Sequence, residues 1–276
     1  TKKAASELRT RFQMALEKER SGNPDNNLVG EALTGMEQCF IGTIHSFCAR
    51  LLRERPVEAG ISVSFAEAGE EEDRMLREAA WDNHINNLPA DDRALTGLAA
   101  TGLSPLQLKH AFLHYADYPD MELWPGEESP PQILPMNKEV DAIRRYTDHM
   151  MSLRSRLPEN CGNDHLIPVY MEFPELLSNY DPEDPRDLFD IFLLFDRKIA
   201  PVQKVWMGAG FSKEECLSEG DRWNTFRETV IAPALRRLRE NRYGPVMRFL
   251  SGARAVYDRM RSEAGVLNYQ DLLMKA

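Results

Sequence analysis

The chain has 276 residues, 42% of them hydrophobic, which is enough to bury the core of one large domain or two modest ones. Its formal net charge of −10 argues against indiscriminate nucleic-acid binding, because phosphate affinity comes mainly from Lys and Arg, although a local basic surface on an acidic body remains compatible with it. Its four cysteines show no C-x-x-C spacing, which argues against a disulfide framework or a zinc site and predicts reduced thiols in a cytoplasmic protein.

The first predicted elements are helices that flank one strand-like run. Residues 4–16 place apolar side chains on one helical face, 22–25 end that helix, and a short helix is predicted for 28–33. Residues 39–43 have the pattern of a strand. An amphipathic helix follows at 46–55, with an apolar face made by Phe47, Cys48, Leu51 and Leu52.

The rest of the chain is predicted to be almost entirely helical. Four acids at 70–73 form a solvated helix start, and this helix continues to about Asn86. Five prolines predict an irregular loop at 117–135, and Gly244-Pro245 is a predicted hinge. Further helices are predicted at 136–156, near 175, and at 186–200, 221–239 and 246–261. Asn268 and Asp271 have the spacing of a capping box for a last helix.

The apolar runs and the chain ends give two further expectations. The longest apolar run, 188–195, contains Asp190 and is far too short to cross a bilayer, so no membrane partner is expected. The sequence begins at Thr1 inside one helical pattern and stops at Ala276 barely two turns into another. We therefore expect a piece of a longer protein, in which the strand at 39–43 finds its sheet partners.

Three separated segments resemble motifs of superfamily-one DNA helicases of the UvrD/Rep/RecB type. Residues 1–8, TKKAASEL, resemble T-x-K-A-A-x-E-[LM]; residues 42–48, GTIHSFC, resemble T-[IFL]-H-[SG]-F. Residues 267–273, LNYQDLL, resemble the [FY]-x-D-L-L segment just ahead of the Walker B strand. The order is that of the family, and the residues around His45 together with 58–60 most resemble the RecB/AddA branch of recombination helicase-nucleases, which are ATP-dependent exonucleases.

The resemblance implies a fold and a division of the chain. It implies a mainly α chain in which a helical accessory domain at 56–262 is inserted in a partial RecA-like α/β motor lobe at 1–55 and 263–276. The family's phosphate loop would precede Thr1, its Walker B segment would follow Ala276, and the sequence contains no G-x-x-x-x-G-K-[ST]. ATP and Mg²⁺ are therefore expected as cofactors of the parent helicase, with no cofactor or ATPase activity for this chain by itself.

Candidate DNA contacts lie at two predicted helix starts. Thr43, His45 and Ser46 offer hydroxyl and imidazole groups beside free helix N–H groups, which suit a phosphate. The alternative is a helix cap with a satisfied histidine, and the resemblance favours DNA contact. Phe47 could stack on a base, although its place in the apolar stripe favours core packing. The other candidates of this kind are Thr1, Lys2 and Lys3.

The lysines at the first helix start oppose the helix dipole, which an anion bound there would explain. The alternative is a solvated terminus. The family often has Asn where this chain has Lys2, so a charge contact is expected there in place of an amide contact.

An arginine-rich segment at 236–261 provides a second candidate surface. It holds eight arginines against only Glu240 and Asp258, and Arg254 and Arg259 are the residues we expect to contact duplex DNA ahead of the junction. The alternatives are a solvated helix face, or arginines that pair with acids elsewhere. His110 and His114 are four residues apart but have no evident third ligand, so no metal site is predicted. No catalytic residue is predicted either.

Three hypotheses on function follow. The first is a DNA-contacting part of an ATP-dependent helicase that binds single-stranded or forked DNA in recombination and repair. The second is a helical docking module for a second subunit of a helicase-nuclease, for which the acidic segments 117–128 and 172–190 are suited. The third is an unrelated helical domain whose motif match arises by chance.

Overall fold

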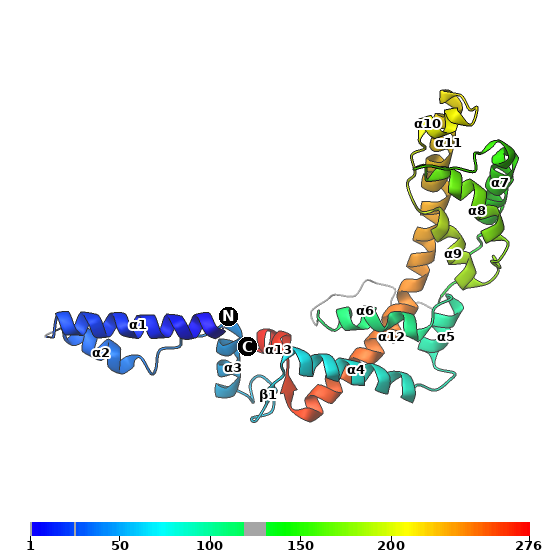
Figure 1. Ribbon diagram of the computed structural model, residues 1–276. Helices are drawn as coiled ribbons and strands as arrows, with labels where there is room; N and C mark the ends of the chain where they lie inside the picture. Colours follow the sequence, from blue (N-terminus) through cyan, green and yellow to red (C-terminus); the bar gives the residue numbers. More distant parts are fainter. Residues whose placement is uncertain (1, 25, 119–130) are drawn as a thin grey trace. The chain divides into compact units, whose positions relative to one another are not determined.

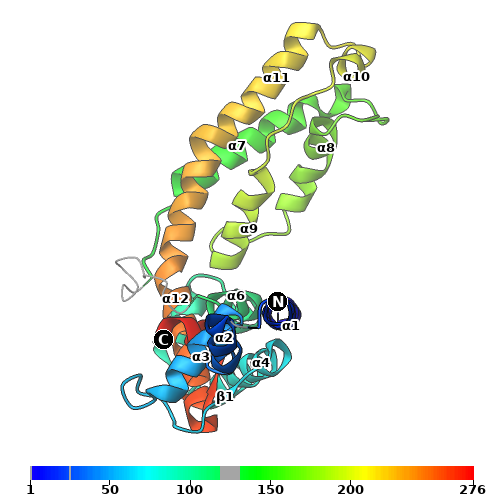
Figure 2. The same cartoon turned by 90° about the vertical axis from the view of Figure 1, so that its left-hand side faces the viewer.

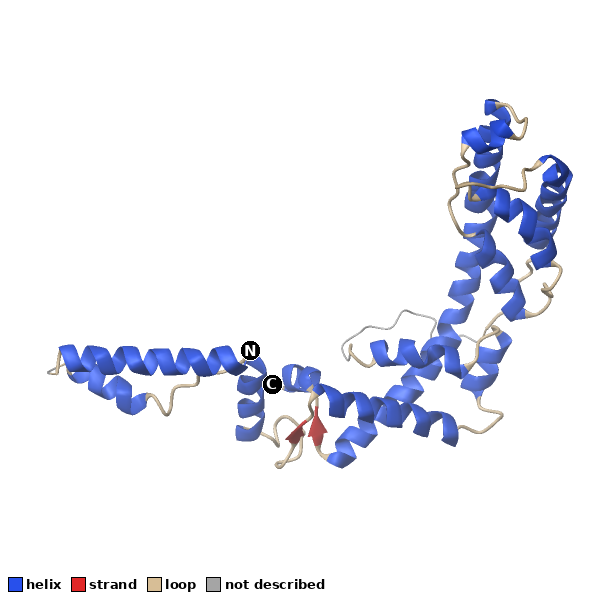
Figure 3. Cartoon of the chain, in the orientation of Figure 1, coloured by secondary structure: helices blue, strands red, loops and turns tan. Residues whose placement is uncertain are grey.

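The computed structural model describes residues 2–24, 26–118 and 131–276, which are mainly helical (Figure 3). They divide into two compact units: unit 1 comprises Thr1–His84, Leu113–Asp120 and Arg254–Ala276, and unit 2 comprises Ile85–Phe112 and Met121–Ala253. The predicted mainly α fold is confirmed, whereas the inserted-domain arrangement with boundaries at 55 and 263 stays a prediction. Within the described ranges, every helix lacks the length or the hydropathy that a bilayer span requires.

Unit 1 combines helices with one small parallel sheet (Figure 1). Its elements are α1 (Lys2–Gly22), α2 (Asn27–Gly35), α3 (Ile44–Glu54), β1 (Ala66–Glu67), most of α4 (Glu70–Asn87), the end of α6 (Lys109–Tyr115), the end of α12 (Ala232–Ala264), β2 (Val266–Leu267) and α13 (Tyr269–Lys275). The helix α1 lies along α2. The helix α3 packs on α13 around a core of Cys48, Ala49, Leu52, Phe65, Leu267 and Leu272.

The predicted strand at 39–43 is wrong. These residues are irregular and half-buried to exposed, because an isolated run has no neighbouring strand to accept its ladder hydrogen bonds. The strands that do form lie elsewhere and are parallel, with Ala66 opposite Val266 and Glu67 opposite Leu267. This pairing brings the chain after α3 beside the chain before α13.

Unit 2 is a helical bundle in which α7 and α8 lie side by side (Figure 2). Its elements are α5 (Arg93–Ala100), a 3₁₀ turn (Pro105–Leu108), the start of α6, α7 (Asn137–Leu153), a 3₁₀ turn (Arg154–Arg156), α8 (Leu166–Leu177), α9 (Pro185–Phe195), α10 (Gln203–Gly208), α11 (Lys213–Phe226), a π-helical turn (Arg227–Ile231) and the first part of α12. Aromatic side chains fill its core, and Phe195 and Trp223 stack with ring centroids 5.5 Å apart.

The predicted hinge at Gly244-Pro245 is also wrong, because α12 runs through it without a break. Proline removes one backbone hydrogen bond and crowds the preceding turn. Burial on both sides of the proline compensates for this cost, since Leu238, Met247 and Phe249 are all buried. Most of the predicted loop at 117–135 lies outside the described residues.

Gly102 provides a test of the packing in unit 2. Its φ is +72°, and a Cβ atom placed there would lie 2.4 Å from the backbone nitrogen of Arg186. We expect Gly102→Ala to lower the free energy of unfolding by at least about 2 kcal/mol, because a left-handed backbone strain adds to a clash with backbone atoms. Urea unfolding followed by circular dichroism measures this change.

The matched control is Gly30→Ala in α2, where an added Cβ atom meets no atom within 4 Å. Alanine favours a helix interior over glycine by roughly 0.5–1 kcal/mol, so this variant should be neutral or more stable. Equal effects of the two substitutions would contradict the close approach at Gly102.

Candidate nucleic-acid interface

The start of α3 gathers the hydroxyl and imidazole groups that the sequence singled out. Thr43 is the N-cap residue, and its Oγ1 accepts a hydrogen bond from the Ser46 N–H at 3.2 Å. The two hydroxyl oxygens lie 2.8 Å apart. The cap is therefore supplied by Thr43 and Ser46, which leaves the imidazole of His45 with no capping role.

His45 is held by an aromatic contact. Its half-buried ring lies 4.9 Å, centroid to centroid, from the ring of Tyr269 at the start of α13. Neither of its ring nitrogens has a hydrogen-bond partner among the described residues. The contact joins two sequence motifs and leaves an oriented imidazole beside a helix N-terminus, where its N–H can meet an anion.

Phe47 is placed differently from the predicted core position. Its side chain is 45% exposed and packs beside Phe40, with ring centroids 5.5 Å apart. The buried face of α3 is made by Cys48, Ala49 and Leu52. Core packing for Phe47 is therefore wrong, and base stacking by its exposed ring stays a prediction.

A buried polar network positions α13, and with it Tyr269. The Tyr257 hydroxyl donates to Asp73, and the Asn268 side-chain amide donates to the Tyr257 oxygen at 3.0 Å. Asn268 also accepts from the Asp271 N–H at 2.9 Å, which confirms the predicted capping box. Burial raises the pKa of Tyr257 to about 12 and the hydrogen bond to Asp73 acts in the same direction, so the phenol remains a donor.

The acids at 70–72 are exposed, as predicted for a solvated helix start, and Asp73 alone departs from that interpretation. Its side chain is buried and also accepts from Arg77 at 2.6 Å. An acid and an arginine four residues apart are a signal of such a pair, but this spacing also fits a solvated helix face. The burial of Asp73 follows only from the fold, because its partner Tyr257 lies far along the chain.

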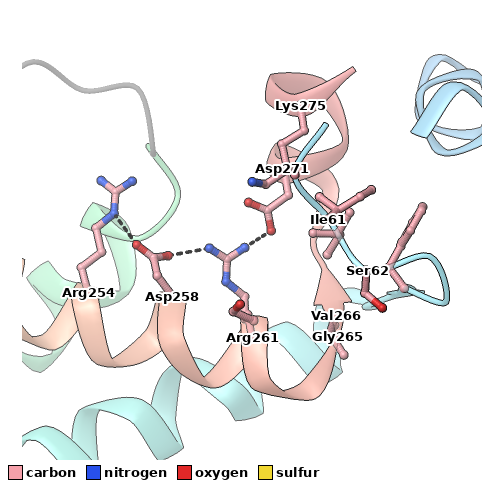
Figure 4. A pocket seen from close by; sticks show the side chains of 13 residues that line it. Ile61, Ser62, Arg254, Asp258, Arg261, Gly265, Val266, Asp271 and Lys275 are labelled. Carbon is pink, nitrogen blue, oxygen red and sulfur yellow. Dashed lines mark hydrogen bonds and ion pairs between the residues drawn. The ribbon is translucent and has the colours of Figure 1, made fainter. Parts of the chain in front are cut away.

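An alternating row of charges lines a pocket of about 360 Å³ in unit 1 (Figure 4). Arg254 faces Asp258 at 3.6 Å, and Arg261 donates to both Asp258 and Asp271. Lys275 lies at the edge of this row. The cations and anions largely neutralise one another, so this row ties α12 to α13.

The arginine-rich segment is mostly paired. Arg236 pairs with Glu240, and Arg237 pairs with Glu139. These pairs agree with the alternative hypothesis that the arginines of this segment are neutralised by acids of the same chain. Arg254 pairs with Asp258, and its guanidinium carbon lies 5.3 Å from the centroid of the Tyr115 ring. Arg259 is exposed and forms no ion pair with a described carboxylate, so it is the better DNA-contact candidate of the predicted two.

The first predicted contact group is only partly described. Thr1 lies outside the described residues, Lys2 begins α1, and the side chain of Lys3 is exposed. The apolar face predicted for α1 is largely exposed as well, with Leu8 and Phe12 at 59% and 46%. Contacts of Thr1, Lys2 and Lys3 with DNA stay predictions.

The sequence was compared with models of known protein families. Residues 1–200 match the UvrD/REP helicase N-terminal domain. The chain belongs to this family. No group of three or more His, Cys, Asp or Glu side chains that could hold a metal ion occurs among the described residues.

Three relatives identify the similar branch of the family. The chain is similar to an ATP-dependent helicase/nuclease subunit from Natranaerobius thermophilus, with 34% identity over 85 residues, which are 31% of this chain and 7% of that protein. The corresponding protein from Desulforudis audaxviator is 40% identical over 78 residues, 28% of this chain and 6% of that protein. The one from Bacillus velezensis is 26% identical over 133 residues, which are 45% of this chain and 11% of that protein. The matched segments thus span about a tenth or less of these relatives, and the predicted resemblance to helicase-nucleases is confirmed.

The hydroxyl of Tyr257 offers a test of the network that positions α13. Tyr257→Phe should lower the free energy of unfolding by about 1–3 kcal/mol, because it removes a donor from a buried carboxylate. Thermal unfolding at several denaturant concentrations measures the effect. Tyr118→Phe is the control, since that side chain is 58% exposed and should change stability by less than about 0.5 kcal/mol. Similar losses in both variants would contradict a structural role for the network.

Proposed function

We propose that this chain is a DNA-contacting part of an ATP-dependent helicase related to these helicase/nuclease proteins, and that the start of α3 holds a phosphate of single-stranded DNA. The observation that carries this proposal is His45, whose ring packs on Tyr269 while both of its nitrogens lack a described partner. Membership of the helicase family supports the choice of DNA as the anion.

The chemistry of this site suits a contact with DNA that does not depend on the base sequence of the DNA. Helix N–H groups, a hydroxyl pair and an imidazole N–H are hydrogen-bond donors for phosphate oxygens, which carry no base information. Phe47, exposed one turn along, adds an aromatic surface on which a base of any kind can stack. A translocating enzyme needs such contacts, because it must release and regain the strand at every step.

The charges on unit 2 favour a second role for that unit, as a docking surface for another protein of the same complex. Arg237 pairs with Glu139, Arg156 with Glu215 and Arg239 with Asp196, so these cations are neutralised within the unit. The segment 181–187 presents exposed acids that repel a phosphate backbone. Of the acidic segments expected to dock a partner, 172–190 is described, whereas 117–128 lies mostly outside the described residues.

We assign ATP and Mg²⁺ binding to the whole helicase, in which the motor lobe would supply a phosphate loop that is absent from this sequence. The contribution of this chain is then to hold DNA and to set the geometry of the lobe.

Anisotropy of a labelled forked DNA with a single-stranded arm, titrated with the 276-residue chain across a salt series, tests the proposal. Binding should weaken steeply as salt increases, because phosphate contacts release counterions. His45→Ala should weaken binding about tenfold or more, because a hydrogen bond to a charged group contributes about 1.5–3 kcal/mol. Arg259→Glu should also weaken it.

His165→Ala is the control, because His165 is an exposed histidine of unit 2. Its DNA affinity should equal that of the unaltered chain. Absence of salt-sensitive binding, or equal losses from the two histidine variants, would overturn DNA contact at α3 and leave the docking role.

A further inference from the structure

A second pocket, of about 310 Å³, lies within unit 2 between the starts of α7 and α9 and the first third of α12. Leu134, Val140, Leu188 and Leu238 give its wall an apolar part, and Arg242 is the one cation among its described lining residues. An apolar pocket of this size with a few convergent polar groups is the usual form of a small-ligand site.

Arg242 is the unusual group of this pocket. Its Nε donates to the Thr101 carbonyl at 3.0 Å, Nη2 reaches the Pro185 carbonyl at 3.5 Å, and the guanidinium carbon lies 3.6 Å from the centroid of the Phe189 ring. No described carboxylate lies within ion-pair distance of it. Burial lowers the pKa of Arg242 to about 10, and the charge of Asp190 acts in the opposite direction.

The guanidinium group of Arg242 has N–H donors that its two carbonyl contacts do not use. An arginine carries five N–H groups, and the two carbonyl contacts of Arg242 engage two of them. A half-buried cation with unused donors gains from any anion that can enter its pocket.

The start of α7 also lines the pocket, and its first turn already contains one acid, Glu139, which pairs with Arg237. Met136 at the N-cap offers no side-chain hydrogen bond to the first turn, and Met136 and Asn137 both line the pocket. The N-terminal N–H groups of a helix and its dipole favour an anion there. Two features from separate parts of the chain thus converge on one pocket.

We propose that this pocket binds a carboxylate carried on a small apolar group, with Arg242 as its charge partner. Glu183 also lines the pocket, and the charge of Asp190 acts on Arg242, so a polyphosphate would be repelled. A single carboxylate needs one guanidinium, and the apolar wall accepts a few carbon atoms beside it. The source is either a short-chain carboxylic acid or an acidic side chain of a peptide.

Calorimetric titration of the whole chain with 4-methylpentanoate, and with its amide as the matched neutral probe, tests the proposal. The carboxylate should bind saturably and at least tenfold more tightly than the amide. Acetyl-leucyl-glutamyl-leucine amide tests the peptide source. Saturable binding of either carboxylate supports the site, the tighter one identifying the source, and failure of both overturns it.

Two variants with opposite expected effects on carboxylate affinity test whether the carboxylate binds in this pocket. Arg242→Gln should weaken carboxylate binding at least tenfold, and Glu183→Gln should strengthen it about two- to fivefold by removing a like charge. Arg144→Gln is the control, because Arg144 is exposed, pairs with Asp141 and does not line this pocket. Glu183→Gln and the comparison of acid with amide remain decisive if Arg242→Gln fails to fold. Binding that is the same for acid and amide, or unchanged in both pocket variants, would overturn the proposal.

Discussion

Three buried polar side chains, Asp73, Tyr257 and Asn268, must satisfy one another for unit 1 to form. They come from α4, α12 and the cap of α13, and a buried polar group without a partner costs roughly 1–3 kcal/mol. Their mutual hydrogen bonds therefore fix where α13 begins. The row of charges from Arg254 to Asp271 strengthens the same junction, because Arg261 lies between two carboxylates.

The candidate interface depends on this constraint. Once Asn268 caps α13, Tyr269 is the first residue of the helix, and its ring lies against His45. The imidazole is then oriented by packing, so its nitrogens remain available for a ligand. A contact site whose donors are oriented before the ligand arrives loses less conformational entropy on binding. The structure thus connects a buried network to a half-buried imidazole through an aromatic contact.

Local features of the sequence predicted local structure, and distant contacts limited the rest. The helix at α3 and the capping box at Asn268 depend on residues within one turn, so the pattern suffices. Residues 39–43 match a strand pattern, yet a strand also needs a partner that no local pattern reveals. Pro245 was expected to break α12, but burial around it overrides the propensity. The pairing of His45 with Tyr269 likewise could not be predicted, because the order of two motifs does not show which side chains meet.

The nitrogen chemical shifts of the six histidine rings, recorded as oligo-dT is added to the chain, test DNA contact at the start of α3. We expect saturable shifts of the His45 ring nitrogens, because one of them donates to a phosphate, with no change for His165. The shifts should vanish as salt is raised, together with binding. Oligo-dT binding that leaves the His45 nitrogens unchanged would contradict DNA contact at the start of α3.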